Sequence, residues 1–164
     1  MKTSALYLRT IIFGITDSLV STVGLLAGLD VAGAPHATLA LTGIVYAFVE
    51  AFSMAIGNYL SEESAEEYVA KGTVGTRAAF SGGVIMFFVF VVAAFIPILP
   101  YLVSTSSLAL VGSVALSILA LFIVGLASGK VARLPMLKRG IRMALLGGSA
   151  IVIGVIVGLF VPVS

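Results

Sequence analysis

Five long apolar runs constrain the fold of this chain more than any other feature of its sequence. They cover residues 10–29, 37–60, 78–102, 107–128 and 143–163, and only short connectors separate them. A helix that crosses a bilayer needs about 20 mostly apolar residues. Since 60% of the residues are hydrophobic and 10% are charged, we predict an all-α integral membrane protein, a single domain over residues 1–164 with five transmembrane helices.

The basic residues predict how these helices are oriented. They lie before the first run, between the second and third runs, and between the fourth and fifth, at Lys2, Arg9, Lys71, Arg77, Lys130, Arg133, Lys138, Arg139 and Arg142. The positive-inside rule therefore places the N-terminus in the cytoplasm and the C-terminus outside. The alternative for the first run is a cleaved signal peptide, but the run is too long for one and contains Asp17.

Two carboxylates interrupt the apolar runs. Asp17 lies in the first run and Glu50 in the second, and no Lys or Arg lies inside any run. An ionised side chain near the bilayer centre costs roughly 2.5–3.5 kcal/mol on insertion scales, so it normally faces a partner or a water-filled path. A cation that binds and leaves is the simplest partner. Two alternatives remain: Asp17 as a structural hydrogen-bond anchor, and Glu50 protonated against a backbone carbonyl.

A polar stripe descends the second run. Glu50, Met54, Asn58 and Glu62 recur every four residues, a step of about 6 Å that keeps to one helix face. Asp17 is predicted to lie at a depth between Met54 and Glu50. Oxygen donors combined with a thioether favour a first-row divalent ion such as Fe²⁺ or Mn²⁺. A methionine in an apolar helix is, however, more often a packing residue than a ligand.

An acidic cluster follows the stripe. Glu62, Glu63, Glu66 and Glu67 would form two like-charged i,i+4 pairs at a helix C-terminus, where negative charge is disfavoured. Bound cations would relieve this repulsion, so Glu62 and Glu66 are predicted to collect metal at the cytoplasmic mouth. The alternative is an acidic helix end that is simply solvated.

Two segments resemble signatures of the vacuolar iron transporter family, which includes the yeast Ccc-type vacuolar carriers. Residues 13–28, FGITDSLVSTVGLLAG, are similar to its helix-one signature, and residues 53–61, SMAIGNYLS, to its helix-two signature. Residues 125–142 and 154–158 resemble its last two helices more weakly. The resemblance covers nearly the whole chain.

The resemblance implies a homodimer of five-helix subunits that exports Fe²⁺ or Mn²⁺ from the cytosol in exchange for protons. It implies that Asp17 and Met54 line the pathway at the dimer interface. This chain has Asn58 where family members often have Glu, and Ser18 where they often have Gly. Eukaryotic members have a long acidic helical domain that binds metal between helices two and three, and this chain has only a short connector there. The resemblance therefore implies a bacterial or archaeal plasma membrane, with the acidic residues 62–67 as a reduced substitute for the metal-binding domain.

Three further features of the sequence predict local structure. Gly24/Gly28 and Gly154/Gly158 are small-xxx-small pairs that permit close helix approach and are compatible with a dimer. Pro97 and Pro100 are expected to end or kink the third helix. His36, beside Pro35, is predicted to be a solvated loop residue.

The sequence favours a transporter over an enzyme. There is no cysteine to supply thiolate ligands, and we find no phosphate-binding loop or nucleophile elbow. We therefore expect no catalytic residues, no resident cofactor and no nucleic-acid partner. Two other classes remain open: a carrier or channel for another cation or for protons alone, and a non-transporting membrane scaffold in which Asp17 and Glu50 bond to partner helices.

Overall fold

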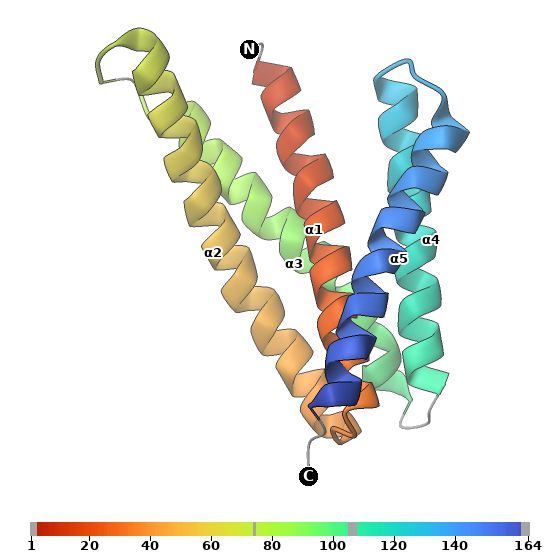
Figure 1. Cartoon of the computed structure of the whole chain (residues 1–164). Helices are drawn as coiled ribbons and strands as arrows, with labels where there is room; N and C mark the ends of the chain where they lie inside the picture. The colour runs from red at the N-terminus through yellow and green to blue at the C-terminus, as the bar shows by residue number, and fades with distance from the viewer. Residues whose placement is uncertain (1–2, 74, 105–107, 162–164) are drawn as a thin grey trace.

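The fold was analysed in a computed structural model that describes residues 3–73, 75–104 and 108–161. These residues form five helices and no strand: α1 (Thr3–Val31), α2 (His36–Ala70), α3 (Arg77–Val103), α4 (Leu108–Val131) and α5 (Met136–Phe160) (Figure 1). Each helix is long and apolar enough to cross a membrane. The predicted class, an all-α integral membrane protein with five spanning helices, is thereby confirmed.

The helix bounds differ from the apolar runs mainly at the charged ends. The second helix was predicted to end at residue 60, yet α2 continues to Ala70 through the acidic cluster. The fifth was predicted to begin at residue 143, yet α5 begins at Met136 and includes the basic segment 138–142. The predicted end of the fifth run at residue 163 lies outside the described residues. A helix can keep its backbone hydrogen bonds beyond the membrane, where its residues are polar. The length of an apolar run therefore predicts the membrane-spanning part of a helix and not its full length.

The prolines of α3 do not end it. Pro97 and Pro100 both lie inside the helix, which continues to Val103. Of the two expectations, that these prolines end the helix or kink it, the first was wrong and the second remains a prediction. The extension brings Tyr101 against the C-terminal end of α1, where its hydroxyl donates a hydrogen bond of 2.9 Å to Asp30 Oδ2.

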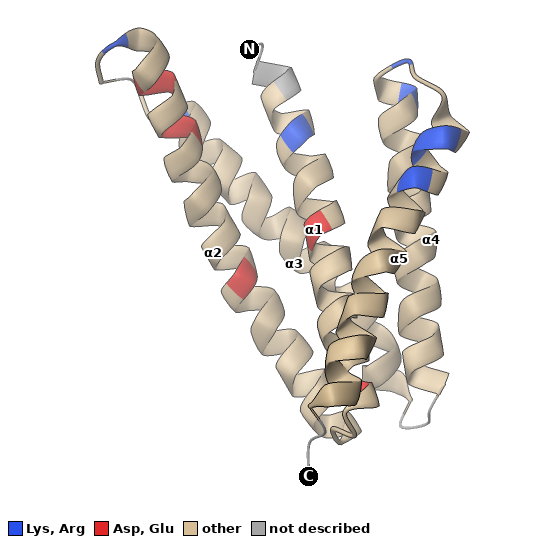
Figure 2. Cartoon of the chain, in the orientation of Figure 1, with Lys and Arg blue, Asp and Glu red and all other residues tan. Residues whose placement is uncertain are grey.

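The helices form a bundle that is closed at one end and divided at the other. Figure 1 shows α2 and α3 diverging from α4 and α5 toward the end of the bundle that holds the N-terminus, with α1 between the two pairs. We call this the N-terminal end. At the opposite end, buried side chains of α1 to α4 form a common core that includes Leu26, Leu39, Ile98 and Ala109. The N-terminal end also carries the basic residues that the structure describes (Figure 2), and it is the predicted cytoplasmic side.

The two small-xxx-small pairs pack on each other within this chain. A Cβ added to Gly28 would lie 2.7 Å from the backbone oxygen of Gly154, and one added to Gly158 would overlap the backbone of Gly28. The four glycines thus allow α1 and α5 to touch backbone to backbone. Because these glycines pack against each other within one subunit, they give no support for a dimer.

Candidate functional site

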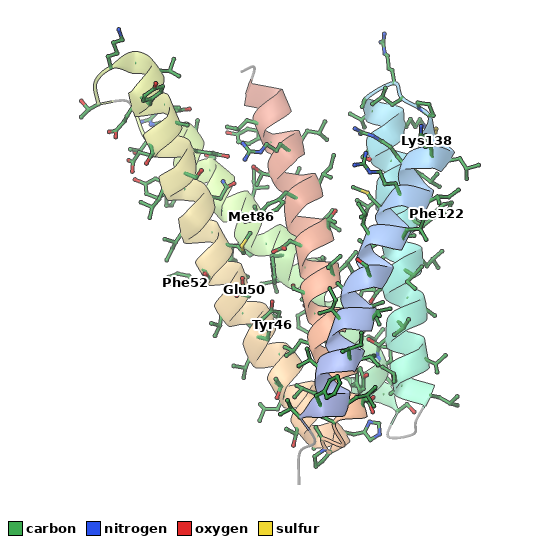
Figure 3. The ribbon with its side chains drawn as sticks, in the orientation of Figure 1. Tyr46, Glu50, Phe52, Met86, Phe122 and Lys138 are labelled. Carbon is green, nitrogen blue, oxygen red and sulfur yellow. The ribbon has the colours of Figure 1, made fainter. Side chains whose placement is uncertain are left out.

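The two intramembrane carboxylates lie near each other in space. Asp17 of α1 and Glu50 of α2 are both half-buried, and Glu50 is near enough to Asp17 for the two charges to repel. Tyr46, one turn before Glu50, lies near Ser21 and Asp17 of α1. Figure 3 shows Tyr46 and Glu50 on the side of α2 that faces α1. The predicted similar depth of Asp17 and Glu50 therefore corresponds to real proximity between two helices.

A cavity lies next to this pair, between α1, α2 and α3. It has a volume of about 190 Å³ and is lined by Arg9, Thr10, Phe13, Met54, Gly57, Asn58, Ser61 and Met86. Asp17 and Glu50 each lie one helical turn beyond its deepest lining residues, Phe13 and Met54. The cavity therefore adjoins the carboxylate pair on the side of the N-terminal end.

A second cavity, which we call the outer cavity, continues from the first, or inner, cavity toward the N-terminal end. It has a volume of about 480 Å³ and is lined by Leu6, Arg9, Ser61, Glu62, Ala65, Glu66, Val69 and Ala70. Arg9 and Ser61 line both cavities. Together the two cavities form a polar series that begins near the helix ends with Glu66 and Glu62, passes Asn58, and reaches Met54.

Glu62 is not a solvated cap residue. Its side chain is 7% exposed, and Oε1 accepts a hydrogen bond from the Thr10 hydroxyl at 3.4 Å. Among the side chains that the structure describes, Oε2 of Glu62 and Nδ2 of Asn58 are buried without a hydrogen-bond partner. A buried carboxylate oxygen and a buried amide N–H group with no partner are both costly. The carboxylate oxygen can receive a cation or a water proton, whereas the amide N–H group needs an acceptor such as a water oxygen.

Glycines of α3 provide the space for these polar groups. A Cβ added to Gly82 would lie 2.5 Å from Glu62 Oε2 and 2.9 Å from Asn58 Nδ2. A Cβ added to Gly83 would lie 2.9 Å from the backbone oxygen of Ala55. Gly83 therefore sets how closely α2 and α3 approach, and Gly82 provides the room in which Glu62 and Asn58 lie.

The acidic residues of the cluster differ in their surroundings. Glu62 and Glu66 line the outer cavity, as expected for residues that collect cations. Glu63 instead accepts a hydrogen bond of 2.8 Å from the Tyr59 hydroxyl on the same helix. Across residues 3–73, 75–104 and 108–161, no three Asp, Glu or His side chains come close enough to hold a metal ion by themselves. A site on this series therefore needs thioether, amide or hydroxyl donors, or groups from a second copy.

Sequence reasoning missed four residues near these polar groups or at the far end of the same helices. Met86 of α3 and Thr10 of α1 line the inner cavity, but in the sequence they are one more methionine and one more threonine of an apolar run. Asp30 and Tyr101 meet at the opposite end of the bundle. Asp30 lies at the edge of the first run, and its partner is 71 residues away, so no local pattern connects the two.

His36 also differs from its prediction. It begins α2, is partly buried, and lies beside Tyr101 with 6.1 Å between ring centroids. Its Nδ1 atom is shielded from solvent. The prediction of a solvated loop residue was wrong because the extension of α3 to Val103 covers this ring.

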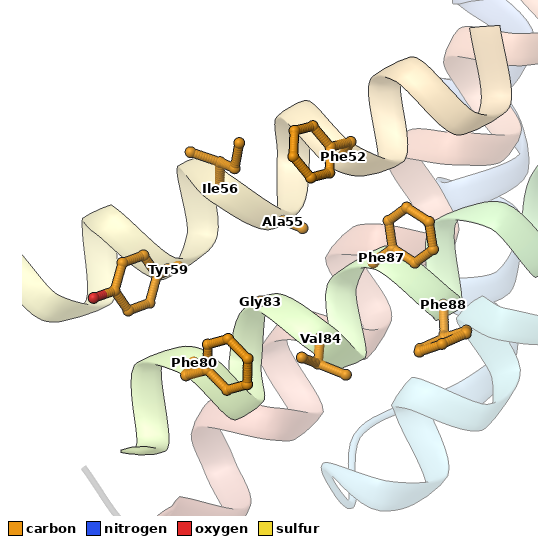
Figure 4. A pocket seen from close by; sticks show the side chains of 9 residues that line it. All are labelled: Phe52, Ala55, Ile56, Tyr59, Phe80, Gly83, Val84, Phe87 and Phe88. Carbon is orange, nitrogen blue, oxygen red and sulfur yellow. The ribbon is translucent and has the colours of Figure 1, made fainter. Parts of the chain in front are cut away.

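A third groove has a different character. It lies between α2 and α3, has a volume of about 610 Å³, and is lined by Phe52, Ala55, Ile56, Tyr59, Phe80, Gly83, Val84, Phe87 and Phe88 (Figure 4). Phe52 points away from Glu50 in Figure 3 and is 61% exposed. Its aromatic and aliphatic lining offers no charged ligand, so this groove suits lipid chains and not a metal ion.

The fold defines a class of protein, an integral membrane protein with five spanning helices, and two cavities with polar lining residues lie among its first three helices. The comparison with known families agrees, because the family model of the VIT family matches residues 8–81 and 71–159. The chain therefore belongs to the VIT family, a family of membrane transporters of metal ions, and the resemblance found in the sequence is confirmed. A comparison with curated proteins finds no match.

Proposed function

We propose that this protein exports Fe²⁺ or Mn²⁺ from the cytosol in exchange for protons. One observation carries the proposal: Asp17 and Glu50 lie near each other at the inner end of the polar series lined by Glu62, Asn58 and Met54. Two neighbouring carboxylates repel each other in a low-dielectric environment. Either a divalent cation or added protons relieve that repulsion, so the two compete for one site.

The proposed route follows the two cavities. Glu66 and Glu62 collect the metal ion at the N-terminal end, and Asn58 and Met54 accept it next. Asp17 and Glu50 then bind it near the middle of the membrane. Protonation of these carboxylates from the other side neutralises them and releases the ion. Glu50 is assigned to the route because it lies on the α1 side of α2 and is near enough to Asp17 for the two charges to interact.

We further propose that the protein works as a homodimer in a bacterial or archaeal plasma membrane. Asp17 and Glu50 are only half-buried by their own chain, and a carboxylate exposed to lipid is costly. A second copy packed over the exposed side of Asp17 and Glu50 would cover the carboxylates and double the number of acidic ligands.

The test is uptake of Fe²⁺ and Mn²⁺ into proteoliposomes under an imposed proton gradient. We expect gradient-dependent uptake by the wild type and a fall of about 10-fold or more in Asp17→Asn, because losing even an outer-shell partner of a metal ligand has an effect of this size. Asp30→Asn is the matched control. It makes the same change on the same helix, at a carboxylate whose partner is Tyr101 and not the polar series.

Each other outcome has a definite meaning. Wild-type liposomes no more permeable to either metal than empty ones would refute the transport proposal and favour the scaffold. Proton flux that persists without metal uptake would favour a proton carrier. Metal flux that ignores the proton gradient would contradict the exchange mechanism. Light scattering of the detergent-solubilised protein measures the mass of the oligomer, and a monomer would contradict the dimer.

A further inference from the structure

Met86 of α3 occupies a position that its sequence context does not reveal. Its side chain is fully buried, and Figure 3 shows it between α2 and α1. It lines the inner cavity together with Met54 of α2. Two thioethers from different helices therefore face one space of about 190 Å³, which has room for a metal ion with several water molecules.

Gly14 of α1 positions the Met86 sulfur. A Cβ added to Gly14 would lie 2.9 Å from Met86 Sδ. The sulfur thus lies directly against the helix surface at a point where α1 has no side chain. Asp17 follows Gly14 by three residues, which is about one helical turn. The contact with Gly14 therefore holds the thioether about one turn of α1 away from the carboxylate.

The other groups around the cavity are consistent with a site for a soft cation. Asn58 lines the same cavity, and its buried Nδ2 donor, which has no hydrogen-bond partner among the described side chains, suits a water molecule beside the ion and not direct contact with it. Arg9, Thr10 and Ser61 complete the polar lining, and Thr10 donates a hydrogen bond to the carboxylate of Glu62. The guanidinium of Arg9 weakens the binding of any cation here, which suits a transient stop on a route and not a storage site.

We propose that Met54 and Met86 together form a thioether subsite that selects soft or borderline metal ions over hard ones. Thioether sulfur favours ions such as Cu⁺, Ag⁺ and, more weakly, Fe²⁺, whereas Mg²⁺ and Ca²⁺ prefer oxygen. Only the role of this subsite in transport rests on the proposed function; its binding of soft ions does not. The subsite would exclude the abundant hard cations of the cytosol before they reach Asp17 and Glu50.

The direct test uses the methionine methyl groups as reporters. The chain has five methionines, so protein labelled with ¹³C at the methionine methyl gives few NMR signals. The probe is Ag⁺, a diamagnetic soft cation, added to the full-length protein in detergent. We expect the Met54 and Met86 signals to shift together along one binding curve, while Met143 of α5 stays unchanged and Mg²⁺ shifts none of the three.

Two variants separate a ligand from a packing residue. Met86→Leu keeps the volume, and such exchanges usually cost less than about 1.5 kcal/mol of stability. We expect it to weaken Ag⁺ binding at Met54 by about 10-fold or more, because even the loss of an outer-shell group weakens metal binding to this extent. Met143→Leu is the matched control and should leave the Ag⁺ affinity unchanged.

The outcomes also separate this inference from the proposed function. A Met54 shift with no Met86 shift, or an unchanged Ag⁺ affinity in Met86→Leu, would overturn the subsite even if metal transport is intact. Joint shifts in a protein that fails to transport Fe²⁺ and Mn²⁺ would support the subsite and refute the transport proposal. Because the wild-type titration is informative by itself, the result does not depend on the folding of the variant.

Discussion

Two adjacent glycines of α3 should respond in opposite ways to the same substitution. A Cβ at Gly83 would lie 2.9 Å from the backbone oxygen of Ala55, whereas a Cβ at Gly82 would meet the ends of the Glu62 and Asn58 side chains. A backbone oxygen of a packed helix cannot move alone, but the end of a long side chain can. Gly83→Ala should therefore separate α2 from α3, while Gly82→Ala should displace only polar groups.

The expected magnitudes follow from these contacts. Overpacking against a rigid neighbour costs about 1–3 kcal/mol. Replacing Gly by Ala in a helix gains about 0.5–1 kcal/mol from backbone entropy, and this gain is shared by both variants. Gly82→Ala should thus be as stable as the wild type or slightly more stable, and Gly83→Ala should be less stable than Gly82→Ala by about 1–3 kcal/mol.

The assay is thermal unfolding of both variants in the same detergent, followed by metal uptake in proteoliposomes. Gly82→Ala should keep the thermal midpoint and lose uptake, because Glu62 and Asn58 are displaced from the cavities. Gly83→Ala should lower the midpoint. If Gly82→Ala is the less stable variant, or if it transports as the wild type does, the assigned roles of the two glycines are wrong.

Two further predictions concern packing away from the cavities. Gly154→Val should separate α1 from α5, because its side chain would overlap the backbone of Gly24; we expect loss of folded protein in size-exclusion chromatography, and a normal elution profile would contradict the close contact. Tyr101→Phe removes the hydrogen bond to Asp30 and should destabilise the protein by about 1–3 kcal/mol. In an Asp30→Asn background this thermal effect should shrink, and an equal effect in both backgrounds would show that the hydroxyl does not act through Asp30.

Much of the fold could be predicted from the sequence because membrane insertion depends on local properties. The length and hydropathy of each run determined the number of helices, since every spanning backbone must satisfy its own hydrogen bonds. Asp17 and Glu50 were identified in the same way, because a charge in an apolar run is conspicuous in the sequence. Met54 and Asn58 followed from the four-residue spacing of the α2 stripe.

The tertiary structure decided which residues meet. Met86 lines the inner cavity only because α3 packs beside α2 and against Gly14 of α1, and an apolar run contains no signal of this neighbour. Glu62 is buried because Gly82 leaves room for it, although its sequence context predicts solvent exposure. Contacts between helices depend on rotation and crossing angle, which hydropathy does not encode. The sequence by itself therefore determined the helices and their charged positions, and only the packing determined the cavity that these positions surround.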